Sequence, residues 1–147
     1  MATTIAQVRA GLVNAIKATA TDVNGRALHA SERVSEQVNG PQAWVKIPAG
    51  SYEQTMGSLD RKRMRAEVEM LVPVAGGADN AQLIMDHFLS NTGGGSIHAA
   101  IAADRYLGGV AKYAMVPGFH DYDPDQVTTI NAQQFLTATI DVVVDVQ

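Results

Sequence analysis

The stretch FLTATIDVVVDV, residues 135–146, decides the fold. Apolar and polar residues alternate along it with a period of two, which is the pattern of a long β-strand with one buried and one largely polar face. Residues 61–74 repeat this alternation. The apolar side of that second run carries Met64, Ala66, Val68, Met70 and Val72. The opposite side carries Arg63, Arg65, Glu67 and Glu69. Two such strands predict a sheet with one apolar face that other elements must cover.

Helical periodicity occupies three other segments. Residues 4–19 place apolar side chains at steps of three and four, and Thr4 and Gln7 have the spacing of a capping box. Asp79 is expected to cap a second helix, and Ser96 a short third one that ends near Gly108 and Gly109. The apolar side of the second helix carries Ala81, Ile84, Met85, Phe88 and Leu89.

Shorter strands are predicted between these elements. They are expected at residues 27–29, 43–47, 110–116 and 126–130. Pro48 is expected to end the second of them, and residues 49–60 and 117–125 are expected to be loops. The sequence therefore predicts an α+β fold with an antiparallel or mixed sheet of four to five strands, helices packed on one face, and a single domain over residues 1–147.

Composition narrows the functional classes. The chain has 147 residues, of which 46% are hydrophobic and 18% charged, and this low charge favours an oligomer with part of its surface covered. The absence of cysteine excludes thiol nucleophiles and cysteine-ligated metals. The N-terminus lacks the pattern of a secretory signal, and no apolar run approaches the roughly 20 residues that span a bilayer. Neither secretion nor membrane insertion is expected.

No catalytic, cofactor or metal site is predicted. The glycine-rich residues 92–96 lack the Gly-Lys-Ser/Thr ending of a phosphate loop, which favours a hinge and helix cap. Asp121, Asp123 and Asp125 alternate like the start of a calcium loop, but Gln126 and Ala132 stand where that loop needs glycine and glutamate. A solvated or partner-facing acidic loop is favoured there, with cation binding left open. The four histidines have no i, i+4 pairing, and no nucleophile elbow occurs, so an enzyme is not expected.

One local feature opposes the acidic balance of the chain. Residues 61–65 hold four of the 11 basic residues, whereas the net charge is −4. Glu67 and Glu69 on the same strand face balance them, which favours a solvated or subunit-contact face over a nucleic-acid site.

The arrangement also resembles a known family. The N-terminal helix opens with TIAQVRAGL, residues 4–12, and residues 41–48 form a proline-bounded strand. The loop 52–60 precedes the long strand, and the hinge 90–96 precedes IHAAIAAD, residues 97–104, and LGGV, residues 107–110. Together with the terminal hairpin, these features resemble the tail terminator proteins of long-tailed, siphovirus-type phages, particularly those of actinobacteria.

The resemblance implies a structural virion protein in the tail neck, assembled in the host cytoplasm. A homohexameric ring would cap the head-proximal end of the tail tube, stop its polymerisation and present a surface to the head-side connector or stopper protein. DNA would pass through the lumen without specific binding, and six copies would carry a charge of roughly −24. No catalytic residue or cofactor is carried over.

Two sets of contact residues are expected in such a ring. The tube or neighbouring-subunit side is predicted to use Tyr52, Glu53, Arg61, Arg63 and Arg65. The side toward the other ring is predicted to use His120, Asp121, Tyr122, Asp123 and Asp125. A head-to-tail connector or head-closure neck protein remains the alternative, and a ligand-binding domain or nucleic-acid module is less favoured.

Overall fold

The computed structural model describes most of the chain. The described residues are 5–19, 29–31, 41–53, 61–74, 78–90, 96–123, 127–130 and 133–146. Residues 91–95 of the expected hinge, residues 27 and 28 of the first short strand, and residues 54–60 and 124–126 lie outside them.

The helices follow the predicted periodicity, except that the third was expected to end near Gly108 and Gly109 and ends at Ala103. They are α1 (Ile5–Thr19), α2 (Ala78–Leu89) and α3 (Ile97–Ala103), followed by the 3₁₀ turn η1 (Leu107–Gly109). Ser96 caps α3 as expected, because its Oγ accepts a hydrogen bond from the backbone N–H of Ala99 at 3.0 Å. Asp79 is not the cap of α2, which begins one residue earlier; it lies in the first turn, where a carboxylate suits the positive end of the helix dipole.

The strands form one mixed sheet. They are β1 (His29–Ser31), β2 (Gln42–Glu53), β3 (Arg61–Pro73), β4 (Tyr113–His120), β5 (Thr128–Ile130) and β6 (Gln133–Val146). Five strands lie in the order β1-β2-β3-β6-β4, and the short β5 pairs with the start of β6. The β1–β2 pair is parallel and the other pairs are antiparallel. The expected α+β class with a mixed sheet is therefore confirmed.

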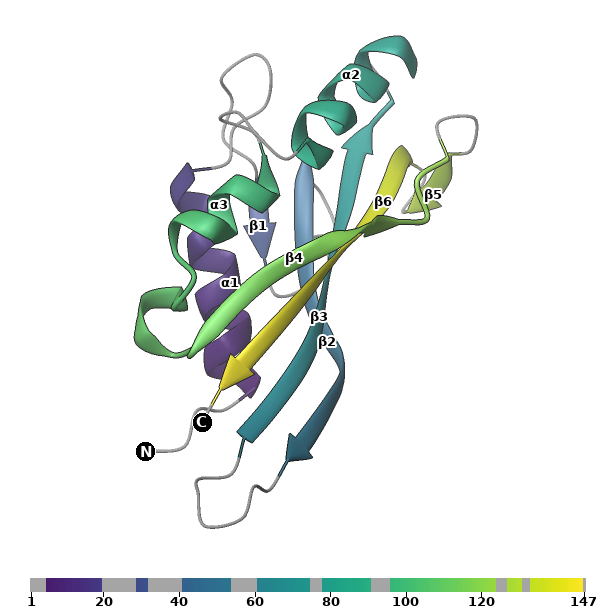
Figure 1. Cartoon of the computed structure of the whole chain (residues 1–147). Helices are drawn as coiled ribbons and strands as arrows, with labels where there is room; N and C mark the ends of the chain where they lie inside the picture. Colours follow the sequence, from purple (N-terminus) through teal and green to yellow (C-terminus); the bar gives the residue numbers. More distant parts are fainter. Residues whose placement is uncertain are drawn as a thin grey trace.

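The molecule has two layers (Figure 1). α1, α2 and α3 cover one face of the sheet, and no described helix lies on the other face. The core between the layers is apolar because the alternate residues of β3 and β6 point into it. From the strands, fully enclosed members include Val68, Met70 and Val144; from the helices, they include Leu12 and Phe88.

Two strands continue past prolines at which the sequence predicted a loop. β2 continues through Pro48 to Glu53, and the register shifts between Lys46 and Ala49. β4 starts later than expected, at Tyr113, and continues through Pro117 to His120, with a register shift between Met115 and Gly118. A β-bulge tolerates proline because it interrupts the ladder hydrogen bonds that proline cannot donate. The expected loops at 49–60 and 117–125 were therefore wrong for residues 49–53 and 117–120.

None of the described helices is both long and apolar enough to cross a lipid bilayer.

Candidate functional site

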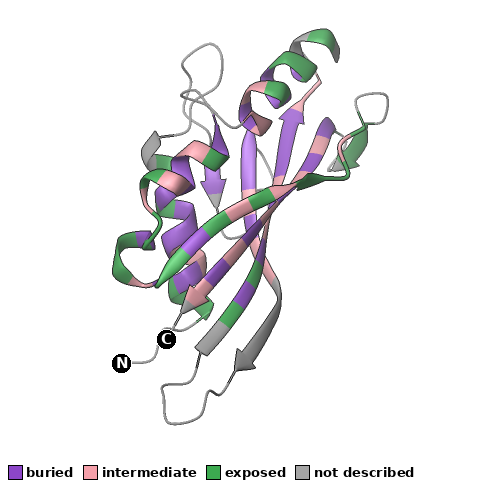
Figure 2. Cartoon of the chain, viewed as in Figure 1, coloured by how far each residue is buried: buried purple, intermediate pink, exposed green. Residues whose placement is uncertain are grey.

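The uncovered sheet face is the first candidate surface. It is built from the residues of β3 and β6 that alternate with the core residues, and Figure 2 shows the resulting change between buried and half-buried positions along β6. On β3 these are Arg63, Arg65, Glu67 and Glu69. The residues opposite them on β6 are Asp145, Val143, Asp141 and Thr139. The predicted polar face of the second long strand is thus open in the fold.

An ion-pair network crosses this face from β2. Lys46 Nζ lies 3.5 Å from Glu67 Oε2 and 3.7 Å from Glu69 Oε2. The same ammonium group lies 5.2 Å from the ring centroid of Trp44, which allows a cation–π contact. Lys46 therefore holds two carboxylates of the neighbouring strand while its ammonium group lies over the aromatic ring.

A second cluster, which shares Glu67 with the Lys46 network, lies where β3, β6 and β4 run side by side. One ligand-type atom each from Glu67, His120 and Asp141 lies within 4.8 Å of the others. His120 Nδ1 is 3.0 Å from Asp141 Oδ2, and His120 Nε2 is 3.4 Å from Asp121 Oδ2. The hydrogen bond with Asp141 raises the pKa of His120 above 6.5, with help from the charges of Asp141, Asp121 and Glu67.

The backbone after β4 brings Asp121 to this cluster. Asp121 has a φ of 58°, in the left-handed region that aspartate adopts more readily than most residues. The Asp121 carboxylate is largely exposed. The acidic loop predicted from the sequence therefore begins at the cluster.

Toward the other end of the strand pair, β3 and β6 are joined by a direct ion pair. Arg63 Nε donates to Asp145 Oδ1 at 2.9 Å, and the two residues are direct cross-strand partners. The Arg63 side chain is half exposed. Such a pair contributes about 1 kcal/mol or less to stability and chiefly fixes the pairing of charges on the face.

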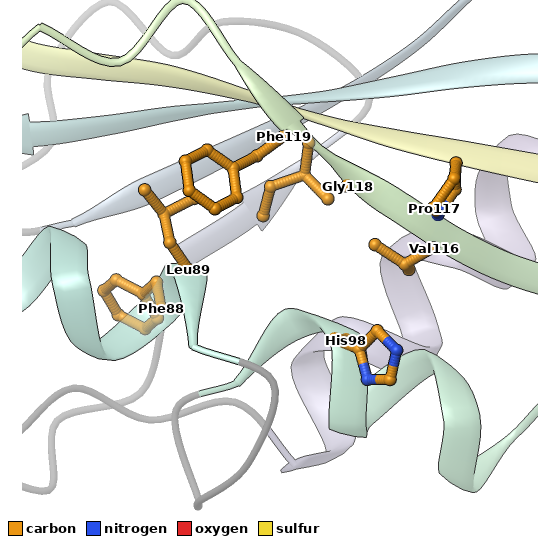
Figure 3. A pocket seen from close by; sticks show the side chains of 8 residues that line it. Phe88, Leu89, His98, Val116, Pro117, Gly118 and Phe119 are labelled. Carbon is orange, nitrogen blue, oxygen red and sulfur yellow. The ribbon is translucent and has the colours of Figure 1, made fainter.

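A groove beside β4 is the second candidate surface. A pocket of about 290 Å³ lies between the end of α2, α3 and β4 (Figure 3). Phe119 of β4 faces Leu89 across it, and His98 of α3 lies near Val116. A smaller pocket of about 170 Å³ continues along α3 and β4 past Arg105 and Tyr113. The larger pocket is lined by Phe88, Leu89, His98, Val116, Pro117, Gly118, Phe119 and Ile140.

The larger pocket of this groove has a mainly apolar lining. Among the residues lining the larger pocket, His98 has the one ionisable side chain. Apolar walls of this kind suit the insertion of an apolar side chain.

Tyr122 connects the segment after β4 to α2. Its hydroxyl donates to Asp86 Oδ1 at 2.8 Å, and its ring packs against the core and lies 6.5 Å from the ring of Phe119. Burial and the hydrogen bond to Asp86 raise the pKa of Tyr122 well above 10. This side chain therefore anchors the segment after β4 to the helix layer.

The predicted contact residues fall into two separate groups. Tyr52 and Glu53 at the end of β2 pair through the backbone with Lys62 and Arg61 of β3. Arg63 and Arg65 follow on β3 with exposed side chains. In the second group, His120, Asp121 and Asp123 are exposed, Tyr122 is half-buried, and Asp125 lies outside the described residues. The backbone positions therefore place the first five residues on the β2–β3 hairpin and the second group at the end of β4.

Glu67 and Asp141 were missed as site residues. The alternation placed each on the polar side of its strand, but only the register makes them direct cross-strand partners. His120 was expected in a loop, so nothing in the sequence connected it with either carboxylate. The signal that was present is a carboxylate in the middle of the polar face of each long strand.

Neither protein-family models nor curated proteins provide a relative of this chain. No protein-family model matches the chain, and no curated protein matches it significantly.

Proposed function

We propose that this chain is a non-enzymatic structural protein of the phage tail neck, a tail terminator that forms a homohexameric ring on the head-proximal end of the tail tube. The observation that carries the proposal is the apolar character of β4, the last strand on its side of the sheet. Large exposed hydrophobic side chains occur there at Tyr113, Met115 and Phe119, and at Tyr106 in the preceding turn.

An edge strand with exposed apolar side chains favours association. An uncovered edge presents unpaired backbone N–H and C=O groups, and apolar side chains beside it add surface that is stabilised when water is removed. A heterologous contact that covers this edge on every copy closes into a ring when the rotation between copies closes. Met115 and Phe119 are about half exposed, so a neighbouring subunit can still bury much of their area.

The family resemblance supports the same surface. Its more specific stretches, residues 97–104 and 107–110, fall on α3 and η1. α3 contributes His98, Ile101 and Ala102 to the groove beside β4. The segments that resemble tail terminators therefore lie next to the strand that we expect to mediate assembly.

The charge balance fits a ring that DNA crosses. Six copies carry roughly −24 formal charges, which disfavours binding of phosphates along the lumen. The β2–β3 hairpin, with Tyr52, Glu53, Arg61, Arg63 and Arg65, is the proposed contact with the tube or neighbouring subunit. The end of β4 and the acidic residues 121–125 are the proposed contact with the head-side connector or stopper.

Light scattering on the purified protein tests the proposal. We expect a hexamer of about 94 kDa (six times 15.6 kDa), or a monomer that forms rings on added tail tubes, visible by electron microscopy. Met115→Glu and Phe119→Glu are expected to prevent ring formation because they place a charge in the contact. Leu83→Glu, on α2 and 63% exposed, is the matched control and should leave assembly intact.

Other outcomes separate the alternatives. A monomer that ignores tube ends but binds the portal side would favour a head-to-tail connector or head-closure protein. A protein indifferent to both would contradict a neck role. Neutralising Arg63 and Arg65 should weaken assembly or docking to the tube. If the wild type instead bound DNA in a salt-dependent manner and these substitutions abolished that binding, a nucleic-acid-binding module would be favoured.

A further inference from the structure

The cluster on the open face combines three metal-ligand types on three adjacent strands. Glu67 comes from β3, Asp141 from β6 and His120 from β4. One ligand-type atom of each lies within 4.8 Å of the other two. We propose that Glu67, Asp141 and His120 bind one divalent transition-metal cation, of which Zn²⁺ is the best match.

The backbone holds the three ligands in fixed relative positions. Glu67 and Asp141 are direct cross-strand partners, and His120 is the cross-strand partner of Thr139, two residues before Asp141. Residues two apart on a strand share a face, so all three side chains project from the same surface. A site on paired strands needs only side-chain adjustment to bind, whereas a site on loops must also order its backbone.

The charges at this point favour a cation. Like charges directly opposite each other on neighbouring strands are destabilising, and Glu67 faces Asp141 in that position. Lys46 lies on the β2 side of Glu67 and is shared with Glu69. Asp121 adds a further carboxylate beside His120. Three carboxylates, those of Glu67, Asp141 and Asp121, thus lie at the site, and a bound divalent cation would offset the repulsion between Glu67 and Asp141.

The donor set selects the class of metal. An imidazole nitrogen with two carboxylate oxygens suits Zn²⁺ and related transition metals, whereas Mg²⁺ and Ca²⁺ favour all-oxygen sites. Tetrahedral Zn²⁺ with bonds near 2.1 Å separates its ligand atoms by about 3.4 Å. His120 Nδ1 and Asp141 Oδ2 are already 3.0 Å apart, so the half-buried carboxylate of Glu67 makes the main adjustment. Three protein ligands would leave a fourth position for water.

Asp121 has the position of a supporting residue. Its Oδ2 lies 3.4 Å from His120 Nε2. The proposed metal ligand is the other ring nitrogen of His120, Nδ1. A metal-bound histidine usually donates its other N–H to a carboxylate, which fixes the tautomer and the ring orientation. Asp121 would therefore orient the imidazole, and the metal would tie the last residue of β4 to the two central strands.

Isothermal titration calorimetry with ZnCl₂ tests the proposal. The protein should be tag-free, treated with a chelator and dialysed into a buffer that does not bind metal. We expect one Zn²⁺ per chain, a Tm that rises with Zn²⁺ concentration, and no comparable effect of Mg²⁺. His120→Ala and Asp141→Asn should weaken binding by about tenfold or more, and Asp121→Asn by about tenfold.

A matched histidine variant controls for nonspecific binding. His98 is exposed on α3 and lies outside the cluster, so His98→Ala should bind Zn²⁺ like the wild type. Circular dichroism should show that each variant is folded, since the substituted side chains are at the surface. Absence of stoichiometric binding by the wild type, or binding that survives both His120→Ala and Asp141→Asn, would overturn the proposal. These readouts do not depend on ring formation, so they remain decisive whether or not the protein caps tail tubes.

Discussion

The two faces of the β3–β6 pair are built from alternate residues of the same strands but are stabilised differently. On the covered face Val68 lies opposite Ile140, and both are removed from water by the helices. On the open face Glu67 lies opposite Asp141, next to Lys46 and His120. Burial of apolar area provides most of the stability of a domain, whereas exposed ion pairs contribute little. The charged arrangement therefore adds little to stability, and we assign part of it to the proposed cation site.

The largest difference in stability between the two faces is expected from substitutions at two adjacent residues of β3. Met70→Ala, on the fully buried side, should lower the free energy of unfolding by about 2–5 kcal/mol because it leaves a cavity. Glu69→Ala, on the open side, should cost about 1 kcal/mol or less because it removes only an exposed contact with Lys46. Urea denaturation at a fixed chain concentration measures both. Equal losses would contradict the distinction between the faces.

A second test concerns how closely the helix layer packs. Gly11 of α1 lies against η1, and a Cβ there would be 3.0 Å from Leu107 Cβ and Val110 Cγ2 and 3.1 Å from the Leu107 carbonyl oxygen. Gly11→Ala should therefore destabilise by about 1–3 kcal/mol, although alanine is the better helix former. Gly118→Ala is the control, because nothing lies within 4 Å of its added Cβ. If Gly11→Ala were as stable as the wild type in thermal unfolding, η1 would have to move away from α1 at little energetic cost.

A third test concerns the start of α3, one of the covering helices. Ser96 is almost fully buried; its hydroxyl donates to the Ser90 carbonyl at 2.6 Å and accepts from the Ala99 N–H. Ser96→Ala should lower the free energy of unfolding by about 1–2 kcal/mol, because the Ser90 carbonyl and the Ala99 N–H each lose their hydrogen bond to the Ser96 hydroxyl. Ser90→Ala keeps the carbonyl that Ser96 uses, so its effect in chemical denaturation should be smaller. The reverse order would contradict this account of the cap.

The smallest expected effect concerns Tyr122, which joins the end of β4 to α2. Because folding raises the pKa of Tyr122, its contribution to stability is fully present below pH 10 and declines as the pH rises toward the folded-state pKa. Tyr122→Phe should cost about 1 kcal/mol at neutral pH through loss of the bond to Asp86. In an absorbance titration the folded wild type should show one tyrosine that ionises above the ordinary tyrosine pKa of 10. A titration unchanged by Tyr122→Phe would refute the anchoring role.

Some elements were predictable because their signal is local. The two-residue period of 135–146 and 61–74 and the helical spacing of 5–19 each depend on neighbours within a few residues. Pro48 and Pro117 misled the prediction for a physical reason. Proline blocks a regular ladder, and whether a bulge accommodates it depends on the partner strand. The extension of β4 past Pro117 is what carries His120 onto the open face.

The sequence by itself determined which side of each long strand is apolar, because alternation and side-chain chemistry are properties of the chain alone. It also placed Glu67 and Asp141 on the polar sides of their strands. Only the tertiary structure decided that these carboxylates stand opposite each other and that His120 joins them, because strand order, register and bulges depend on contacts between residues far apart in the chain. A binding site assembled from three strands is therefore visible only after the sheet has formed.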